Sequence, residues 1–221
     1  MRVPPPRLLS IGGAVAGPLF VTTFLVEGAL KPDYDPMRHP VSSLALGPYG
    51  WTQAANFIVV GLLTLAFAVG LLRLPGVRQV IGASLVTIWA IGLIGAGIFM
   101  TDPVSGYPPG TPPMPVEPTT AGRLHDLFSV PAFLGLGLAC FVLAAGGGRR
   151  WRAYSLLTGV AFLVTFFLSG VAFSQEAFVD VGGLWQRISV TIGWVWITTL
   201  AVRQLLRSRH QRFGDASRGS S

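Results

Sequence analysis

The sequence predicts an all-α membrane protein, built as a bundle of six transmembrane helices. Of its 221 residues, 51% are hydrophobic and only 11% are charged, and the mean hydropathy is +0.60. A water-soluble domain usually carries about a quarter charged residues, so this composition excludes soluble, disordered and fibrous classes. The third observation is a series of six apolar runs, each long enough to cross about 30 Å of hydrocarbon as a helix.

The six runs cover about residues 8–30, 52–72, 79–100, 124–145, 153–173 and 184–206. The first follows Arg2 and Arg7 as a signal peptide would, but its apolar stretch continues to Leu30, so we expect a permanent helix. No run alternates between polar and apolar residues as a membrane β-strand does. We therefore predict one six-helix domain over residues 1–213 and a polar cytoplasmic tail over 214–221.

The distribution of charge predicts the orientation of this bundle. With both termini in the cytoplasm, twelve of the 16 basic residues and only one of the nine acidic residues lie on the inner side. Basic residues beside transmembrane helices favour the cytoplasmic side of a membrane. We therefore expect cytoplasmic N- and C-termini in a plasma membrane. The same positions also explain the high isoelectric point without nucleic-acid binding.

Two long connections lie on the outer side, at about residues 31–51 and 101–123. The second contains seven prolines, which fix the backbone and remove hydrogen-bond donors, so we expect a stiff, extended cover. The inner connections are short turns. Long connections commonly carry function, so any binding or catalytic site is expected on the outer face.

Polar side chains concentrate at this face, in the first long connection and at the outer ends of the helices. The candidates for catalysis are His39, His125, Asp126 and Ser42. The candidates for ligand binding are Asp33, Asp35, Arg38, Gln53, Asn56, Asp102 and Arg187. Imidazole and carboxylate groups suit a divalent cation, which makes His39, His125 and Asp102 the candidates for a metal site. No established catalytic motif or local metal-ligand spacing accompanies them.

Several strings in the chain are similar to a known family. These strings are residues 17–20 (GPLF), 34–42 (YDPMRHPVS) and 50–57, which reads GWTQAANF, together with Gly122, Leu124 and His125. On these residues the chain resembles the bacterial "domain of unknown function 998" (DUF998) family. The resemblance implies a small polytopic membrane protein, but it brings no established activity and therefore no catalytic residues.

Three functional hypotheses follow from the residues. The leading one is an outward-facing polar pocket that binds a lipid-like or small ligand. The alternatives are a membrane hydrolase or metalloenzyme using His39 and His125 with nearby carboxylates, and a transporter of small molecules or lipids. The sequence identifies no cofactor and does not decide whether the protein is an enzyme. Membrane lipids are the expected partners, and oligomerisation is possible but not indicated.

A structural explanation of the same polar residues also stands, because intramembrane polar groups commonly pair with one another. In that case Arg38 pairs with Asp33 or Asp35, and Arg187 pairs with Glu27 or Asp126. Small residues four apart, Gly13 with Gly17 and Gly92 with Ala96, predict close helix contacts.

Overall fold

The computed structural model describes residues 6–113 and 117–218, and this part of the chain contains six long α-helices. They are α1 (Pro6–Leu30), α2 (Trp51–Leu72), α3 (Val77–Ile98), α4 (Thr120–Ala144), α5 (Arg149–Ser174) and α6 (Gly182–Arg218). Two short 3-10 helices, η1 (Val41–Ala45) and η2 (Glu176–Val181), lie between them. All six long helices are apolar and long enough to cross a membrane. The predicted six-helix, multi-pass fold is thereby confirmed.

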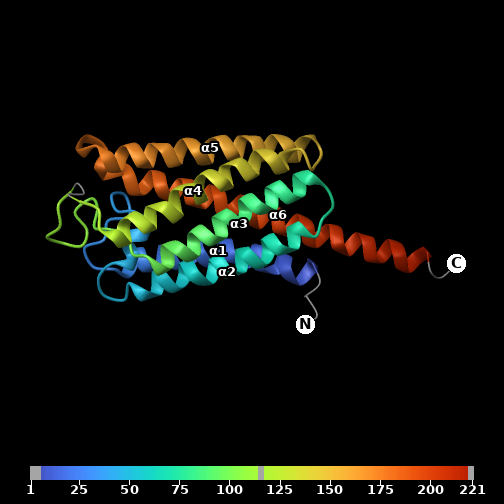
Figure 1. Ribbon diagram of the computed structural model, residues 1–221, viewed down its shortest axis with the longest axis horizontal. Coiled ribbons are helices and arrows are strands. Elements are labelled where there is room, and N and C mark those ends of the chain that lie inside the picture. Colours follow the sequence, from blue (N-terminus) through green and yellow to red (C-terminus); the bar gives the residue numbers. More distant parts are fainter. Residues whose placement is uncertain (1–5, 114–116, 219–221) are drawn as a thin grey trace.

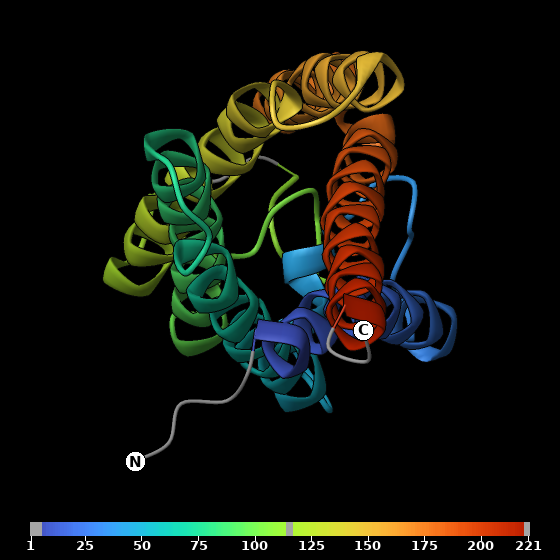
Figure 2. The ribbon, with the colours of Figure 1, turned by 90° about the vertical axis from the view of Figure 1, so that its right-hand side faces the viewer.

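The helices form a closed ring. Each packs against its neighbours in the chain, and α6 closes the ring by packing against α1; Figure 2 shows this arrangement from one end. In Figure 1, α1 begins and α6 ends at the right, which we call the terminal end. The two long loops, described over residues 31–50, 99–113 and 117–119, lie with η2 at the opposite end, the loop end.

Several helices extend beyond their predicted apolar runs, although α3 ends at Ile98 instead of near residue 100. Helix α4 begins at Thr120 instead of near residue 124, because the Thr119 hydroxyl accepts a hydrogen bond from the Gly122 amide at 3.0 Å and caps the helix. Helix α6 continues to Arg218 instead of ending near 206. Hydropathy marks only the part of a helix that meets lipid, whereas backbone hydrogen bonds continue into water. Much of the predicted tail 214–221 is thus helical, and residues 219–221 lie outside the described residues.

The interior of the ring is aromatic and its outer surface is aliphatic. Trp89, Trp194 and Phe162 are at most 1% exposed, and the rings of Trp89 and Trp194 lie 5.6 Å apart. In contrast, Leu138 and Leu157 on the outside are at least half exposed. An apolar outer surface of this kind matches lipid chains, and the buried aromatic rings fill space between the helices.

Small residues allow the helices to approach closely at two places, as their spacing predicts. A β-carbon at Gly17 would lie 2.4 Å from the Thr198 hydroxyl oxygen of α6, and one at Gly92 would lie 2.6 Å from the Phe128 carbonyl oxygen of α4. Both contacts join helices of the same chain. The small residues therefore explain the ring itself.

Candidate functional site

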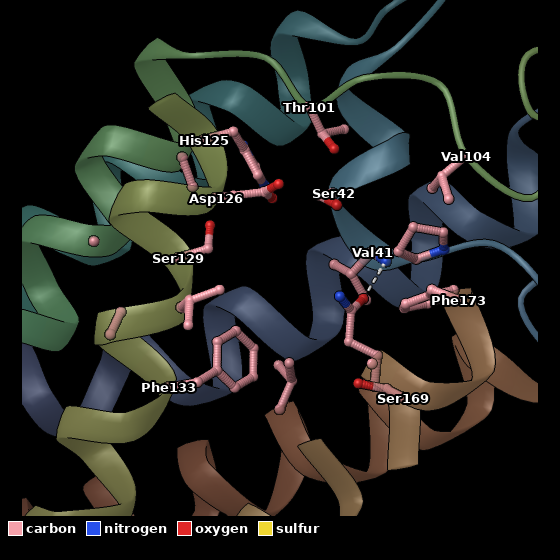
Figure 3. A pocket seen from close by; sticks show the side chains of 18 of the residues that line it. Val41, Ser42, Thr101, Val104, His125, Asp126, Ser129, Phe133, Ser169 and Phe173 are labelled. Carbon is pink, nitrogen blue, oxygen red and sulfur yellow. Dashed lines mark hydrogen bonds between the residues drawn. The ribbon is translucent and has the colours of Figure 1, made fainter. Parts of the chain in front are cut away.

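A cavity of about 620 Å³ lies inside the ring at the loop end, where residues from all six helices and both long loops line it. Figure 3 shows it from close by, with α4 on one side and α5 on the other. Its volume is within the range of about 300–1,000 Å³ that is typical of small-molecule sites. The ring of helices thus encloses a space large enough for a ligand.

The lining of this cavity is polar near the loops and aromatic deeper in the ring. His125, Asp126 and Ser129 lie on consecutive turns at the beginning of α4. Phe133 follows one turn deeper, and the buried Trp89 of α3 contacts its ring at 5.3 Å. The cavity is therefore amphipathic along the direction of the helices.

His125 presents a specific chemical state at the cavity. Its side chain is 6% exposed, and Nδ1 lies 2.9 Å from the Phe99 carbonyl oxygen. A carbonyl oxygen can only accept, so Nδ1 donates in this contact, and the tautomer of this arrangement has its lone pair on Nε2. No hydrogen bond in the described residues uses Nε2. It is free to accept a hydrogen bond from a ligand.

Asp102 holds the beginning of α4 in place. One carboxylate oxygen accepts from the Thr119 amide at 2.8 Å, and the other accepts from the Thr119 hydroxyl at 2.6 Å. Gly122 makes this approach possible, because a β-carbon there would lie 2.0 Å from the Asp102 carboxylate. A negative charge beside a helix N-terminus is also favoured by the helix dipole. Both oxygens of Asp102 are thus already engaged at the edge of the cavity.

Asp126, in contrast, has an unengaged carboxylate. It is exposed, lines the cavity beside His125, and forms neither a hydrogen bond nor an ion pair with any described residue. Figure 3 shows its side chain next to that of His125. Among the described residues that line the cavity, it is the one carboxylate available to a ligand.

His39 lies outside the lining, in a cluster of aromatic rings above the cavity. Its ring centroid is 5.0 Å from that of Tyr107 in the second loop and 5.5 Å from that of Tyr34 in the first. These ring contacts join the two long loops. The Asp35 amide donates to His39 Nδ1 at 2.9 Å. Burial lowers the pKa of His39, while the Asp35 carboxylate opposes that effect. His39 therefore holds the loops together as a neutral ring.

The two tyrosines of this cluster are neutral phenols. Burial raises the pKa of Tyr34 to about 12, against the lowering effect of the neighbouring Arg187 guanidinium. Burial also raises the pKa of Tyr107. The Tyr34 hydroxyl donates to the Pro40 carbonyl oxygen at 2.9 Å and accepts from Arg187. We call Tyr34, His39 and Tyr107 the roof cluster.

Two arginines fix the first loop, with partners other than those the sequence suggests. Arg187 donates to the His39 carbonyl oxygen at 2.8 Å and also to Pro36. Arg38 donates to the Ser105 carbonyl oxygen at 2.7 Å and pairs with Asp180 at 2.5 Å. Arg187 of α6 meets carbonyl groups of the first loop, and Arg38 of that loop reaches the second loop and η2. The predicted pairings with Asp33, Asp35, Glu27 and Asp126 are not formed in the described structure.

Gln53 and Asn56 form a buried amide pair between α1 and α2. The Asn56 amide nitrogen donates to Gln53 Oε1 at 3.2 Å and to the Phe20 carbonyl oxygen at 3.4 Å. Neither residue lines the cavity. The Gln53 amide nitrogen and the Asn56 amide oxygen are buried and have no hydrogen-bond partner among the described residues, so the pair is only half satisfied.

The family model described as "Protein of unknown function (DUF998)" matches residues 14–203. The chain belongs to the DUF998 family. No curated protein and no solved structure matches it. The matched range includes all six helices in whole or in part, together with both loops.

In this DUF998 protein the predicted candidate residues separate into two groups. Ser42, Asp102, His125 and Asp126 line the cavity. The others lie in the roof cluster, among the arginine contacts that fix the first loop, in the amide pair, or on the exposed surface of the first loop. They are His39, Asp33, Asp35, Arg38, Arg187, Gln53 and Asn56. The structure therefore does not bring His39 to the side of the cavity where His125 lies.

Catalytic and metal-binding arrangements find no support in this geometry. The described residues contain no group of three or more His, Cys, Asp or Glu side chains that could hold a metal ion. Neither His39 nor His125 forms a hydrogen bond with Ser42 or Ser129 in the described part of the chain. A nucleophilic serine requires such contact with a base.

Sequence reasoning missed the aromatic part of the site. Trp89, Phe133 and Phe166 line the deep end of the cavity, although each lies in an apolar run that suggests only membrane contact. Their position shows only when the face of each helix is known. Aromatic residues that recur on one helical face were the signal that could have found them.

Proposed function

We propose that this DUF998 protein binds a lipid-like ligand, with its polar group at the loop end of the cavity and its apolar chain directed into the ring. One observation carries the proposal: the lining changes from His125, Asp126 and Ser129 to Trp89 and Phe133 over about two helical turns. Binding sites combine an apolar surface with a few convergent polar groups in this way. A fully polar or fully apolar ligand would leave one end of the cavity unmatched.

The polar end offers hydrogen-bonding groups of both kinds. His125 Nε2 can accept. Gln186 uses Oε1 to accept from the Val41 amide at 2.7 Å, which leaves its amide nitrogen to donate. Groups held by bonds on their other side are already oriented for a ligand, so little conformational entropy is lost on binding.

The cellular setting belongs to the same proposal. We place the protein in the plasma membrane of a bacterium, with the loop end outside and surrounding lipids as its partners. The support comes from the short connections at the terminal end, where Arg73, Arg78, Arg149 and Arg150 lie beside helix ends. Basic residues in such positions favour the cytoplasmic side.

Neither alternative function has a specific observation in its favour. Catalysis lacks contact between an imidazole and a serine or an assembled metal site in the described residues. For transport, the aromatic side chains of Trp89, Trp194 and Phe162 fill the ring on the terminal side of the cavity. Ligand binding is the function that the cavity supports best.

The proposal can be tested with a monoacylglycerol that carries bromine near the end of its chain, because bromine quenches tryptophan fluorescence on contact. With protein in detergent micelles, we expect saturable quenching that largely disappears in Trp89→Phe. Ser129→Phe should abolish this quenching by filling the cavity. Leu127→Phe is the matched control, because Leu127 is 65% exposed on the outside of the same helix.

The outcome that rejects the proposal is equally definite. If quenching in the unmodified protein rises linearly with probe and never saturates, the cavity does not bind an apolar chain. If Ser129→Phe and Leu127→Phe reduce saturable binding equally, the ligand lies elsewhere.

A further inference from the structure

Helices α4 and α5 are tightly packed from their terminal ends to about the middle of α4. A β-carbon at Gly137 of α4 would lie 2.5 Å from a Leu163 methyl carbon of α5. One turn nearer to the loops, the rings of Phe133 and Phe166 stack at 4.4 Å. The two helices are antiparallel. Towards the loop end, the residue numbers of facing positions therefore fall along α4 and rise along α5.

Continued for one more turn, this register places Val130 opposite Gly170, and there the contact ends. A β-carbon at Gly170 would meet no atom within 4 Å. Val130 is 45% exposed, although both residues also line the cavity. Figures 1 and 2 show α4 and α5 diverging towards the loop end. The cavity therefore opens sideways, between two membrane-spanning helices, above the stack of Phe133 and Phe166.

The next turn in the same register places Asp126 opposite Ser174, so that the unengaged carboxylate lies at the loop side of this opening. No lysine or arginine is among the described residues that line the cavity. Arg123 lies one turn from Asp126 on α4 but forms no ion pair with it. A carboxylate without a counter-charge favours a cation and disfavours a phosphate or carboxylate group.

We propose that the ligand is a single-chain amphiphile with a cationic head group, which enters from the membrane between α4 and α5 and places its head beside Asp126. This inference rests on the proposed function and names its ligand class and route. The opening faces the apolar phase in which such a molecule is dissolved. The buried His125, whose Nε2 has no partner among the described residues, adds a hydrogen-bond acceptor beside the same position.

The head-group preference is tested with three brominated probes of equal chain length: a primary alkylammonium, a monoalkyl phosphate and the neutral monoacylglycerol. We expect the ammonium probe to bind about tenfold more tightly than the phosphate probe, as one charge contact of opposite sign implies. Asp126→Asn should reduce this ratio to near one. Glu176→Gln removes an exposed carboxylate that does not line the cavity, and it should leave the ratio unchanged.

The route is tested by stopped-flow measurement of the same quenching in lipid nanodiscs. Gly170→Trp places a large side chain in the open space and should slow association and dissociation by about tenfold each, with a smaller effect on their ratio. Gly170→Leu should give an intermediate effect and guards against misfolding of the larger variant. Val171→Trp, on the exposed neighbouring position, is the control and should leave both rates unchanged.

Each result has its own meaning. If no probe binds saturably, the proposed function fails, and the inference fails with it. If the neutral probe binds but the ammonium and phosphate probes bind equally, the cavity holds amphiphiles and the cationic ligand class is wrong. If the ammonium preference holds while both Gly170 variants exchange probe at the unmodified rate, the ligand does not pass between α4 and α5.

Discussion

The two histidines show how the surroundings of a side chain decide its role. In His39 the Nδ1 atom accepts from a backbone amide, and the ring is enclosed by two tyrosines. In His125 the Nδ1 atom faces a carbonyl oxygen and Nε2 is free at the cavity. The sequence places both near the same end of the bundle. Only the three-dimensional contacts separate a ring that holds loops together from one available to a ligand.

The roof cluster should weaken in mild acid because of His39. Its pKa is lowered by burial, so the folded protein binds this proton less readily than the unfolded chain, whose value is about 6.5. The contribution to stability is therefore present above pH 6.5 and lost as pH falls through the lower folded value. The groups that face His39 are Asp35, Arg38 and Arg187. We expect the melting temperature in detergent to decrease between pH 7.5 and 5.5.

His39→Gln is the matched variant for this pH effect, because it keeps a polar side chain without a titratable ring. Its melting temperature should be lower at pH 7.5 and should depend less on pH. Parallel pH curves for the variant and the unmodified protein would show that another group causes the acid effect.

At the scale of elements, the beginning of α4 depends on the contact between a loop carboxylate and a helix backbone. Asp102 reaches the Thr119 amide only because Gly122 has no side chain in its path. Gly170 in α5 has the opposite surroundings, with open space where a β-carbon would stand. The same residue type thus serves close packing in one helix and borders an opening in another.

Alanine substitutions at these two glycines should have opposite effects on stability. Gly122→Ala forces a β-carbon into the Asp102 carboxylate, so we expect a loss of about 1–3 kcal/mol, typical of overpacking. Gly170→Ala should be neutral or slightly stabilising, because alanine favours a helix over glycine and meets no neighbour. Unfolding in detergent by increasing SDS measures both. A comparable loss in the two variants would contradict the described contacts.

At the scale of the whole molecule, the six helices and their ring define two ends with different charge. Short connections with arginines lie at the terminal end, whereas the long loops and most of the acidic residues lie at the loop end. The composition of the six runs was sufficient to predict the number of helices. Their ends were less predictable, since caps such as Thr119 extend a helix beyond its apolar part.

The proposed orientation leads to a labelling experiment. In a Cys140→Ala background, a cysteine replaces either Pro109, exposed in the second loop, or Gly148, exposed between α4 and α5. We expect a membrane-impermeant maleimide to label Pro109→Cys in intact cells and Gly148→Cys only after permeabilisation, because the arginine-rich end lies in the cytoplasm. The reverse pattern would overturn the orientation and place the cavity on the cytoplasmic side.

The candidate site was predictable only in part. Ser42, Asp102, His125 and Asp126 were identified because polar residues near helix ends are conspicuous in an apolar chain. The partners of Arg38 and Arg187 were not, because long side chains cross between segments that are distant in sequence. The aromatic deep end escaped notice, since an apolar residue inside a membrane run can face either lipid or the interior.

The sequence by itself determined the class of protein, its number of helices and the end where polar groups gather, because hydrocarbon tolerates few charges and requires helical backbone. Tertiary structure alone decided that the helices close into a ring, that α4 and α5 separate above Phe133, and that His125 rather than His39 meets the cavity. These features depend on which face each helix turns inward and on the angle at which neighbours cross. Such relations arise from packing between distant segments, and hydropathy does not predict them.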